Sequence, residues 1–172
     1  DPIATDDESV NRLREQAFLN AGVYIVLRAL RSPQPVAEDL HNEGGIKSFV
    51  EHIHKKKGVE SIHDQVVYLS VKDGDTTAEV ALQYNDSYNE LLLSFANNIH
   101  TTDGGTHETG FKMALTRAMN DYARKNNILK EKDKNYSGED VREGLTAIIS
   151  VKLTDAQFEG QTKAKLGNTS IQ

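Results

Sequence analysis

The sequence contains no cysteine, so disulfide bonds and thiolate metal sites are excluded, and nothing indicates an oxidising compartment. Its six histidines do not make up for this absence. His52 and His54 are two positions apart, and side chains at that spacing do not face each other on a helix. His107, which precedes Glu108, lacks the second histidine of a zincin motif. We therefore expect no metal site.

Long hydrophobic runs are also missing. No stretch of about 18 apolar residues occurs, so we expect no membrane-spanning helix. Residues 1–8 are acidic and have no apolar core, which is unlike a signal peptide. These absences favour a cytoplasmic location. Because the chain begins with Asp1 rather than methionine, it resembles an excised fragment or a processed product, and we divide it into a tail at 1–10 and a single domain at 11–172.

The sequence has no excess of positive charge, since its net charge is −6. A free-standing nucleic-acid-binding protein usually has a basic balance or a basic face, so any attraction to DNA has to be local here. Basic residues recur along one expected helix at Lys112, Arg117, Arg124 and Lys125. A solvated helix face is the simpler interpretation of this stripe. The sharper interpretation is a weak contact with the phosphate backbone of DNA.

Hydrophobic periodicity predicts an alternation of helices and strands. Apolar residues at helical spacing predict helices around 10–18, at 46–57 and in a long segment after Thr106, with a short helical turn at 138–144. Apolar runs predict strands at 23–30, 66–71, 78–84, 91–95 and 147–153. Asp73-Gly74 predicts a hairpin turn, and the three central runs suggest an antiparallel meander. Residues 31–45, which include Pro33 and Pro35, are predicted to form a loop.

A glycine-rich segment, 105–112, nearly matches a mononucleotide P-loop but fails at the residues that matter. Phe111 stands where the lysine belongs, and Met113 stands where Ser or Thr belongs. Gly104, Gly105 and Thr106 still fit a tight turn that leads into a helix N-terminus, which could hold an anion. The simpler interpretation is ordinary helix entry, with Thr106 as the N-cap. No Ser or Thr lies in a nucleophile-elbow pattern, and no pair of carboxylates is singled out by its spacing.

The last segment combines the side chains that best bind phosphate oxygens. After the predicted strand at 147–153, Gly160 frees the backbone, and Gln161, Thr162 and Lys163 follow in succession. They offer amide donors, a hydroxyl and a positive charge. Taken alone, this loop is better explained as a solvated loop with an ordinary surface lysine.

Several other segments favour the phosphate-binding interpretation of this loop, because together they resemble one family. They are Arg14 to Gly22, Glu43-Gly44-Gly45-Ile46, Asn97 to Phe111, and the run from Arg142-Glu143-Gly144 to Gln161-Thr162-Lys163. In combination they resemble the transducer domain of the B subunit of bacterial DNA gyrase, a type IIA DNA topoisomerase, and that of its close relative topoisomerase IV. Tyr84-Asn85 and Leu166-Gly167-Asn168 favour gyrase. The chain departs from the family pattern at 28–34 and 40–42.

The resemblance implies an α/β fold, an α+β two-layer sandwich like the second domain of a ribosomal small-subunit protein. A mixed, mostly antiparallel sheet would have its helices on one face. It would contain a left-handed βαβ crossover, although such crossovers are generally right-handed.

The resemblance also implies an energy-coupling role in an ATP-hydrolysing enzyme that supercoils DNA. A GHKL ATPase domain would precede this chain and a toprim domain would follow it. ATP with magnesium would be bound mainly by that ATPase domain and would drive homodimerisation of B subunits around double-stranded DNA. The gyrase A subunit would be a further partner. Gln161 and Lys163, with Thr162 between them, would contact the γ-phosphate, and Lys112 and Arg117 are assigned to the DNA cavity.

The ATPase and DNA-cleaving motifs of the family are absent from this sequence, so we predict that the isolated chain is inactive. Lys163 would stabilise a transferring phosphoryl group only when another domain holds the nucleotide. A topoisomerase IV transducer domain is the nearest alternative. A small-molecule kinase would need the phosphate loop that Phe111 and Met113 interrupt, and an RNA-binding module of the same fold would need a basic surface.

Overall fold

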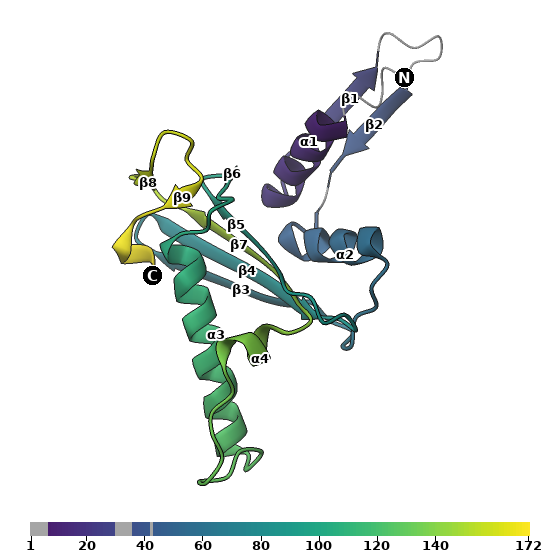
Figure 1. The fold of residues 1–172 in the computed structure, drawn as a ribbon. Helices are drawn as coiled ribbons and strands as arrows, with labels where there is room; N and C mark the ends of the chain where they lie inside the picture. The colour runs from purple at the N-terminus through teal and green to yellow at the C-terminus, as the bar shows by residue number, and fades with distance from the viewer. Residues whose placement is uncertain (1–6, 30–35, 42) are drawn as a thin grey trace. The chain divides into compact units, whose positions relative to one another are not determined.

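The computed structural model describes residues 7–29, 36–41 and 43–172 (Figure 1). The chain forms two compact units, Asp1–Gly58 and Val59–Gln172, and each is described by itself. The predicted tail at 1–10 lies largely outside the described residues, and a helix already begins at Asp7. The assignment of 11–172 to a single domain remains a prediction.

The first unit consists of two helices and a hairpin. Its elements are α1 (Asp7–Leu19), β1 (Ile25–Ala29), β2 (Val36–Leu40) and α2 (Ile46–Lys57). The buried rings of Phe18 and Phe49 stack with centroids 4.8 Å apart and join α1 to α2. The predicted end of α2 is confirmed: three lysines close the last turn, and Gly58 follows in a left-handed conformation with φ +65°.

The predicted loop at 31–45 is wrong in its middle part. Val36–Leu40 forms β2, which pairs antiparallel with β1 from Ile25 opposite Leu40 to Ala29 opposite Val36. The two prolines just before this run favoured a loop, but pairing with β1 satisfies the backbone groups that a loop would expose to water. Residues 31–35 and 42 of the predicted loop, and Leu30 of the predicted first strand, lie outside the described residues.

The second unit is built on a five-stranded sheet with the order β3-β4-β7-β5-β6. Its strands are β3 (Val67–Asp73), β4 (Thr76–Tyr84), β5 (Leu91–Ala96), β6 (Ile99–His100) and β7 (Leu145–Lys152). The predicted hairpin between β3 and β4 is confirmed, with Asp73 opposite Thr76 and Gly74 at φ +58°.

The predicted antiparallel meander is wrong at its third strand. β5 does not pair with β4; it pairs in parallel with β7, and β7 pairs antiparallel with β4. β7 is buried at every position from Leu145 to Val151. A strand that is buried on both faces is most stable in the centre of a sheet, so β7 lies between two strands that are closer to each other in sequence.

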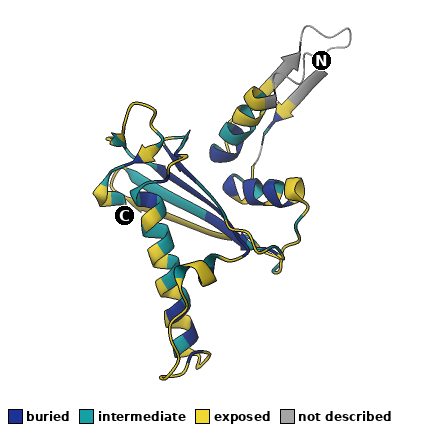
Figure 2. Ribbon diagram, in the orientation of Figure 1, coloured by how far each residue is buried: buried dark blue, intermediate teal, exposed yellow. Residues whose placement is uncertain are grey.

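Helix α3 (Thr106–Lys125) covers one face of this sheet (Figure 1). Its Phe111 and Leu115 pack against a buried cluster formed by Leu82, Leu145 and Ala147. The central strands carry most of the buried positions of this unit (Figure 2). β5, α3 and β7 form a βαβ unit with parallel strands, and its left-handed sense remains a prediction. The predicted α/β fold, with a mixed sheet and helices, is confirmed.

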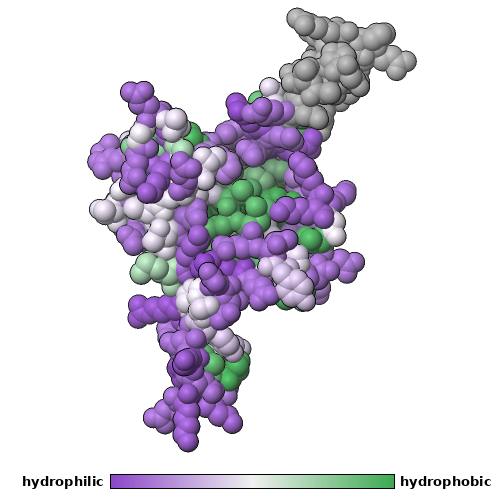
Figure 3. Space-filling model, viewed as in Figure 1, coloured by the Kyte–Doolittle hydropathy of each residue, from purple (hydrophilic) through white to green (hydrophobic). Residues whose placement is uncertain are grey.

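The C-terminal half of α3 extends past the sheet and is held by the segment that follows it (Figure 1). The Asn120 side chain and the Tyr136 backbone exchange two hydrogen bonds, of 3.0 and 2.7 Å. This segment leads into α4 (Gly138–Arg142), which confirms the predicted helical turn, and Ser137 forms a capping box with Asp140. The surface of this part is mainly hydrophilic (Figure 3). Across the described ranges, no helix is long and apolar enough to cross a membrane.

Candidate functional site

The predicted phosphate-binding loop is the tip of a short hairpin. Strand β8 (Phe158–Glu159) pairs antiparallel with β9 (Lys165–Leu166), and residues 160–164 connect them. Gly160 has φ +80°, which confirms that it supplies the backbone freedom expected of it. Lys163 has φ +55°, a left-handed conformation that is uncommon for a lysine and was not predicted. The two positive φ angles turn the chain within a few residues.

The side chains at this tip are exposed and make no polar contact within the described residues. Gln161, Thr162 and Lys163 are all exposed, and none of their side chains makes a hydrogen bond or ion pair with any residue that the structure describes. Lys165, two positions further on, differs because it pairs with Glu159 at 3.1 Å. The predicted amide, hydroxyl and ammonium donors are therefore grouped at one place and available to an external ligand.

The root of the hairpin is fixed to the start of α3. Leu166 is fully buried in the cluster that β7 and Phe111 share. Its amide donates to the Gly104 carbonyl at 3.2 Å, and the Asp103 amide donates to the Ala164 carbonyl at 2.8 Å. The tip therefore projects from a base that belongs to the core.

The glycine-rich turn that resembled a P-loop is needed because Gly105 lies against the backbone of β9. A Cβ atom at this position would lie 2.6 Å from the Leu166 carbonyl oxygen, so only glycine permits the contact with β9. The prediction that Thr106 is the N-cap is wrong: α3 begins at Thr106, and Gly105 is the N-cap, without a side-chain hydrogen bond. The turn receives the backbone of β9, a role that sequence spacing did not indicate.

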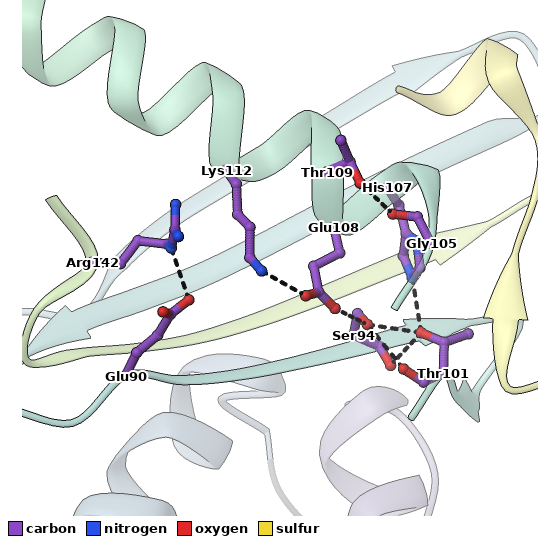
Figure 4. A network of polar contacts seen from close by, with 9 residues as sticks. All are labelled: Glu90, Ser94, Thr101, Gly105, His107, Glu108, Thr109, Lys112 and Arg142. Atoms are coloured by element: carbon purple, nitrogen blue, oxygen red, sulfur yellow. Dashed lines mark hydrogen bonds and ion pairs between the residues drawn. The ribbon is translucent and has the colours of Figure 1, made fainter. Parts of the chain in front are cut away.

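A polar network underlies the first turns of α3 (Figure 4). Ser94 of β5 contacts the Thr101 hydroxyl at 2.8 Å and donates to the Glu108 carboxylate at 3.0 Å. Glu108 also pairs with Lys112 at 3.0 Å. His107 places Nε2 3.1 Å from the Thr101 hydroxyl. The network joins β5 and the residue after β6 to the start of α3, next to the turn that the hairpin root contacts.

His107 is neutral at neutral pH because it is buried. Only 3% of the residue is exposed, and burial lowers its pKa from 6.5 to about 4, against a smaller opposing effect of Glu108. Its Nδ1 atom has no hydrogen-bond partner in the described part of the chain. Sequence spacing had argued against His107 as a metal ligand without giving it another role, and in the structure it is a buried core residue. Among the described residues, no group of acidic and histidine side chains is arranged to hold a metal ion.

The two predicted DNA-cavity residues lie on α3, away from the hairpin contacts described above. Lys112 is paired with Glu108, and Arg117 lies 3.8 Å from Asp121 with most of its side chain exposed. Both line an open groove of about 950 Å³ whose walls also include Arg142. Arg142 itself pairs with Glu90 at 2.9 Å (Figure 4). The groove is basic on its α3 side, although its charges are partly neutralised.

Comparison with known proteins places this fold among the ATPase regions of type II DNA topoisomerases. The crystal structure of the 43K ATPase domain of Thermus thermophilus gyrase B, in complex with an aminocoumarin, matches 96% of this chain and 44% of its own, with a TM-score of 0.83 and 36% identity. The topoisomerase IV ATP-binding domain of Francisella tularensis matches 95% of this chain and 42% of its own, with a TM-score of 0.75 and 27% identity.

The particular family follows from sequence comparison. The family model described as DNA gyrase B matches residues 45–172. The DNA gyrase B protein of Enterococcus faecalis is 52% identical over 165 residues, and that of Clostridium acetobutylicum is 56% identical over 166 residues. Each alignment covers 96% of this chain and 25% of the relative, so the chain spans about a quarter of these curated relatives. The chain belongs to the DNA gyrase B family.

Proposed function

We propose that this chain is the transducer domain of a DNA gyrase B protein and contacts the γ-phosphate of ATP that the neighbouring ATPase domain holds. The observation that supports this function best is the hairpin tip. Gln161, Thr162 and Lys163 are exposed and have no partner within the described residues, while the hairpin root is bonded to α3 and buried beside β7. A phosphate contact at the tip would therefore act on the core of the domain.

The chemistry of the tip suits a phosphoryl group in transfer. The Lys163 ammonium would stabilise the charge on the γ-phosphate oxygens, and the Gln161 amide and Thr162 hydroxyl would add hydrogen bonds. The remaining contacts to ATP and its magnesium ion would come from the neighbouring domain, because the glycine-rich turn of this chain receives β9. By this proposal the isolated chain neither hydrolyses ATP nor cleaves DNA.

The proposal extends to the partners of the intact enzyme. ATP-driven homodimerisation of B subunits would close a clamp around double-stranded DNA, and the toprim domain and the gyrase A subunit would complete the cytoplasmic enzyme. Lys112 and Arg117 would contact the phosphate backbone of the enclosed DNA. Lys112 would have to exchange its pairing with Glu108 for that contact, so we expect weak binding that falls with salt. Gyrase is favoured over topoisomerase IV because DNA gyrase B is the name of the matching family.

Replacement of Lys163 by alanine in the intact subunit tests the proposal. Loss of one charge-assisted contact to a transferring phosphoryl group costs roughly 2–4 kcal/mol, so we expect ATP hydrolysis to fall by about 30- to 1,000-fold. DNA supercoiling should fall with it, while the urea midpoint of unfolding stays unchanged because the side chain is exposed and unpaired within the described residues.

Lys165→Ala is the matched control. It removes a lysine from the same hairpin, but one whose exposed ion pair with Glu159 contributes little to stability. ATP hydrolysis should stay within about twofold of the unaltered subunit. An unchanged steady-state ATPase rate in Lys163→Ala, or equal losses in the two variants, would refute the assignment of Lys163.

A further inference from the structure

The segment between β7 and β8 is held by two asparagine side chains rather than by strand pairing. β7 ends at Lys152 and β8 begins at Phe158. Asn97 donates from Nδ2 to the Leu153 carbonyl and accepts from the Leu153 amide, both at 2.9 Å. Asn168 donates from Nδ2 to the Asp155 carbonyl at 2.8 Å and accepts from the Gln157 amide at 2.6 Å. We name residues 153–157 the connecting segment.

Asparagine suits this task because its side-chain amide offers a donor and an acceptor, as a peptide group does. The two asparagines come from different parts of the chain. Asn97 lies in the turn between β5 and β6, and its own amide donates to the Val151 carbonyl at 2.9 Å. Asn168 follows β9, beside Gly167, whose amide donates to the Gln157 carbonyl at 2.7 Å. One asparagine therefore ties the segment to the sheet, and the other ties it to the hairpin.

Ordinary structural roles do not account for these bonds. Asn97 has φ +49°, and asparagine is favoured in that conformation, yet the turn does not require its side chain to bind Leu153. Asn168 precedes a 3₁₀ turn at Thr169–Ile171, but its side chain makes no capping hydrogen bond there. In both cases the side chain is committed to the connecting segment.

The connecting segment is also the covalent path from the tip to the central strand. Its Leu153 and Ala156 pack against the buried cluster that includes Ile149, Val151 and Leu166. With the segment held, the position of Lys163 is fixed relative to β7 on one side and to the start of α3 on the other. Without the asparagine side chains, the described residues would hold the hairpin through side-chain packing, the bonds of β9 and the bond from the Gly167 amide to the Gln157 carbonyl.

We propose that Asn97 and Asn168 are positioning residues that set the place of Lys163 through the connecting segment. This inference rests on the function proposed above, because it assigns the two residues to the reaction in which Lys163 takes part. Neither residue touches the nucleotide in this proposal.

The first test measures ATP hydrolysis by the intact subunit with Asn168→Ala. A misplacement of about 1 Å costs up to 100-fold in rate, so we expect kcat to fall by about tenfold or more. KM for ATP should change by less than about twofold, since the neighbouring domain supplies most of the nucleotide contacts. Asn168→Asp keeps the acceptor for the Gln157 amide and loses the donor, so its kcat should lie between those of Asn168→Ala and the unaltered subunit.

The decisive measurement is a double-mutant cycle with Lys163→Ala. If Asn168 acts through Lys163, adding Asn168→Ala to Lys163→Ala should lower kcat by less than about twofold. Independent, multiplicative losses would overturn the inference, and so would an unchanged kcat in Asn168→Ala. If Lys163→Ala itself has no effect, the proposed function fails first and this inference with it.

The role of the Asn97 side chain is tested by a variant that keeps the backbone conformation of the turn between β5 and β6. Asn97→Gly retains the left-handed conformation and removes the side chain, and Asn98→Gly makes the same change at the next position, where φ is +65°. We expect kcat to fall clearly more in Asn97→Gly than in Asn98→Gly, which removes the contacts of Asn98 but leaves both bonds to Leu153 in place. Equal effects of the two changes would mean that the turn matters and the bonds to Leu153 do not.

Amide hydrogen exchange in the chain itself tests, without ATP, whether Asn97 and Asn168 hold the connecting segment. The amides of Leu153 and Gln157 should exchange at least about tenfold faster in Asn97→Gly and Asn168→Ala respectively, while the amide of Ile149 in β7 keeps its rate. Unchanged exchange at Leu153 and Gln157 would overturn the inference whatever the ATPase rates are.

Discussion

The two ends of α3 are held in different ways. At the N-terminal end, Gly105 touches the backbone of β9 and His107 is buried. At the C-terminal end, Arg124 donates to the Asn135 side chain and to two backbone carbonyls of the returning segment, all on an exposed surface. The first end relies on close packing, whereas the second relies more on hydrogen bonds in contact with water, although Ala123 and Leu129 are buried there. Packing of that kind fails when one atom is added, whereas exposed hydrogen bonds are replaced by water at low cost.

This difference fits the proposed function. A signal from the hairpin tip would enter α3 at its rigid end, through Leu166 and Gly104, and the helix would transmit it as one body. The C-terminal end could then shift against the segment at 126–137 with the loss of fewer buried contacts, which involve Asn120, Ala123 and Leu129. The same difference ranks the effects that mutations at the two ends should have on stability.

The largest expected effect comes from Gly105→Ala. The added methyl group would lie 2.6 Å from the Leu166 carbonyl oxygen, at a residue with φ +147°. Backbone strain and overpacking each cost about 1–3 kcal/mol, so the free energy of unfolding should fall by roughly 2–6 kcal/mol. Urea denaturation followed by circular dichroism measures it.

Gly160→Ala separates the contact from the backbone conformation. Gly160 also has a positive φ, but a Cβ atom there would meet nothing within 4 Å. We expect a loss of about 1 kcal/mol from strain alone. If the two substitutions cost the same, the contact between Gly105 and Leu166 does not fix the hairpin, and the proposed rigidity of this end is wrong.

His107 predicts a pH dependence at the same end. Its pKa is about 4 in the folded chain and 6.5 when unperturbed, so the unfolded state binds the proton first as the pH falls. Above pH 6.5 both states are neutral, and the contribution vanishes. Between pH 6.5 and about 4 the free energy of unfolding should fall progressively, by roughly 3 kcal/mol in total.

The measurement compares the chain with its His107→Gln variant. Other groups titrate in this window, so the informative quantity is the difference in unfolding free energy between the two proteins at pH 7.5 and at pH 4.5. Glutamine has no proton to gain, and the advantage of histidine should shrink by about 2–3 kcal/mol at the lower pH. A difference that is the same at both pH values would mean that His107 does not titrate as its burial demands.

Local patterns in the sequence predicted the fold where the interactions are local. The helical spacing of apolar residues located α2 and α3, and Asp73-Gly74 located the hairpin of β3 and β4. Sequence order misled the prediction where pairing is long-range. Nothing in the run at 91–95 indicates that β7, some fifty residues later, separates β5 from β4. β8 and β9 each span two residues and exist because Leu166 is held by the core, which no periodicity reveals.

The candidate site likewise has a part that the sequence predicted, the hairpin tip, and a part that it did not, the residues that support the hairpin. The grouping of donors at the tip was predictable because Gln161, Thr162 and Lys163 are consecutive, but their proposed role came from the family resemblance and not from their chemistry alone. The supports were not predictable, since Asn97, Gly105 and Asn168 reach the hairpin from three separate parts of the chain. Asparagine and glycine are common in turns, so a turn explained each of them until the contacts were known.

The smallest expected effect is at the exposed end of α3. Arg124→Ala removes hydrogen bonds to the Asn135 side chain at 2.9 Å, the Lys130 carbonyl at 3.0 Å and the Asp133 carbonyl at 2.7 Å. Because water replaces exposed partners, the free energy of unfolding should fall by only about 1 kcal/mol. Arg124→Lys should lose nearly as much, since one ammonium does not reproduce a planar fork of donors. Amide exchange should quicken at 130–136 and stay unchanged at Leu166. Faster exchange at Leu166 would show that the two ends of α3 are coupled and would contradict the distinction between them.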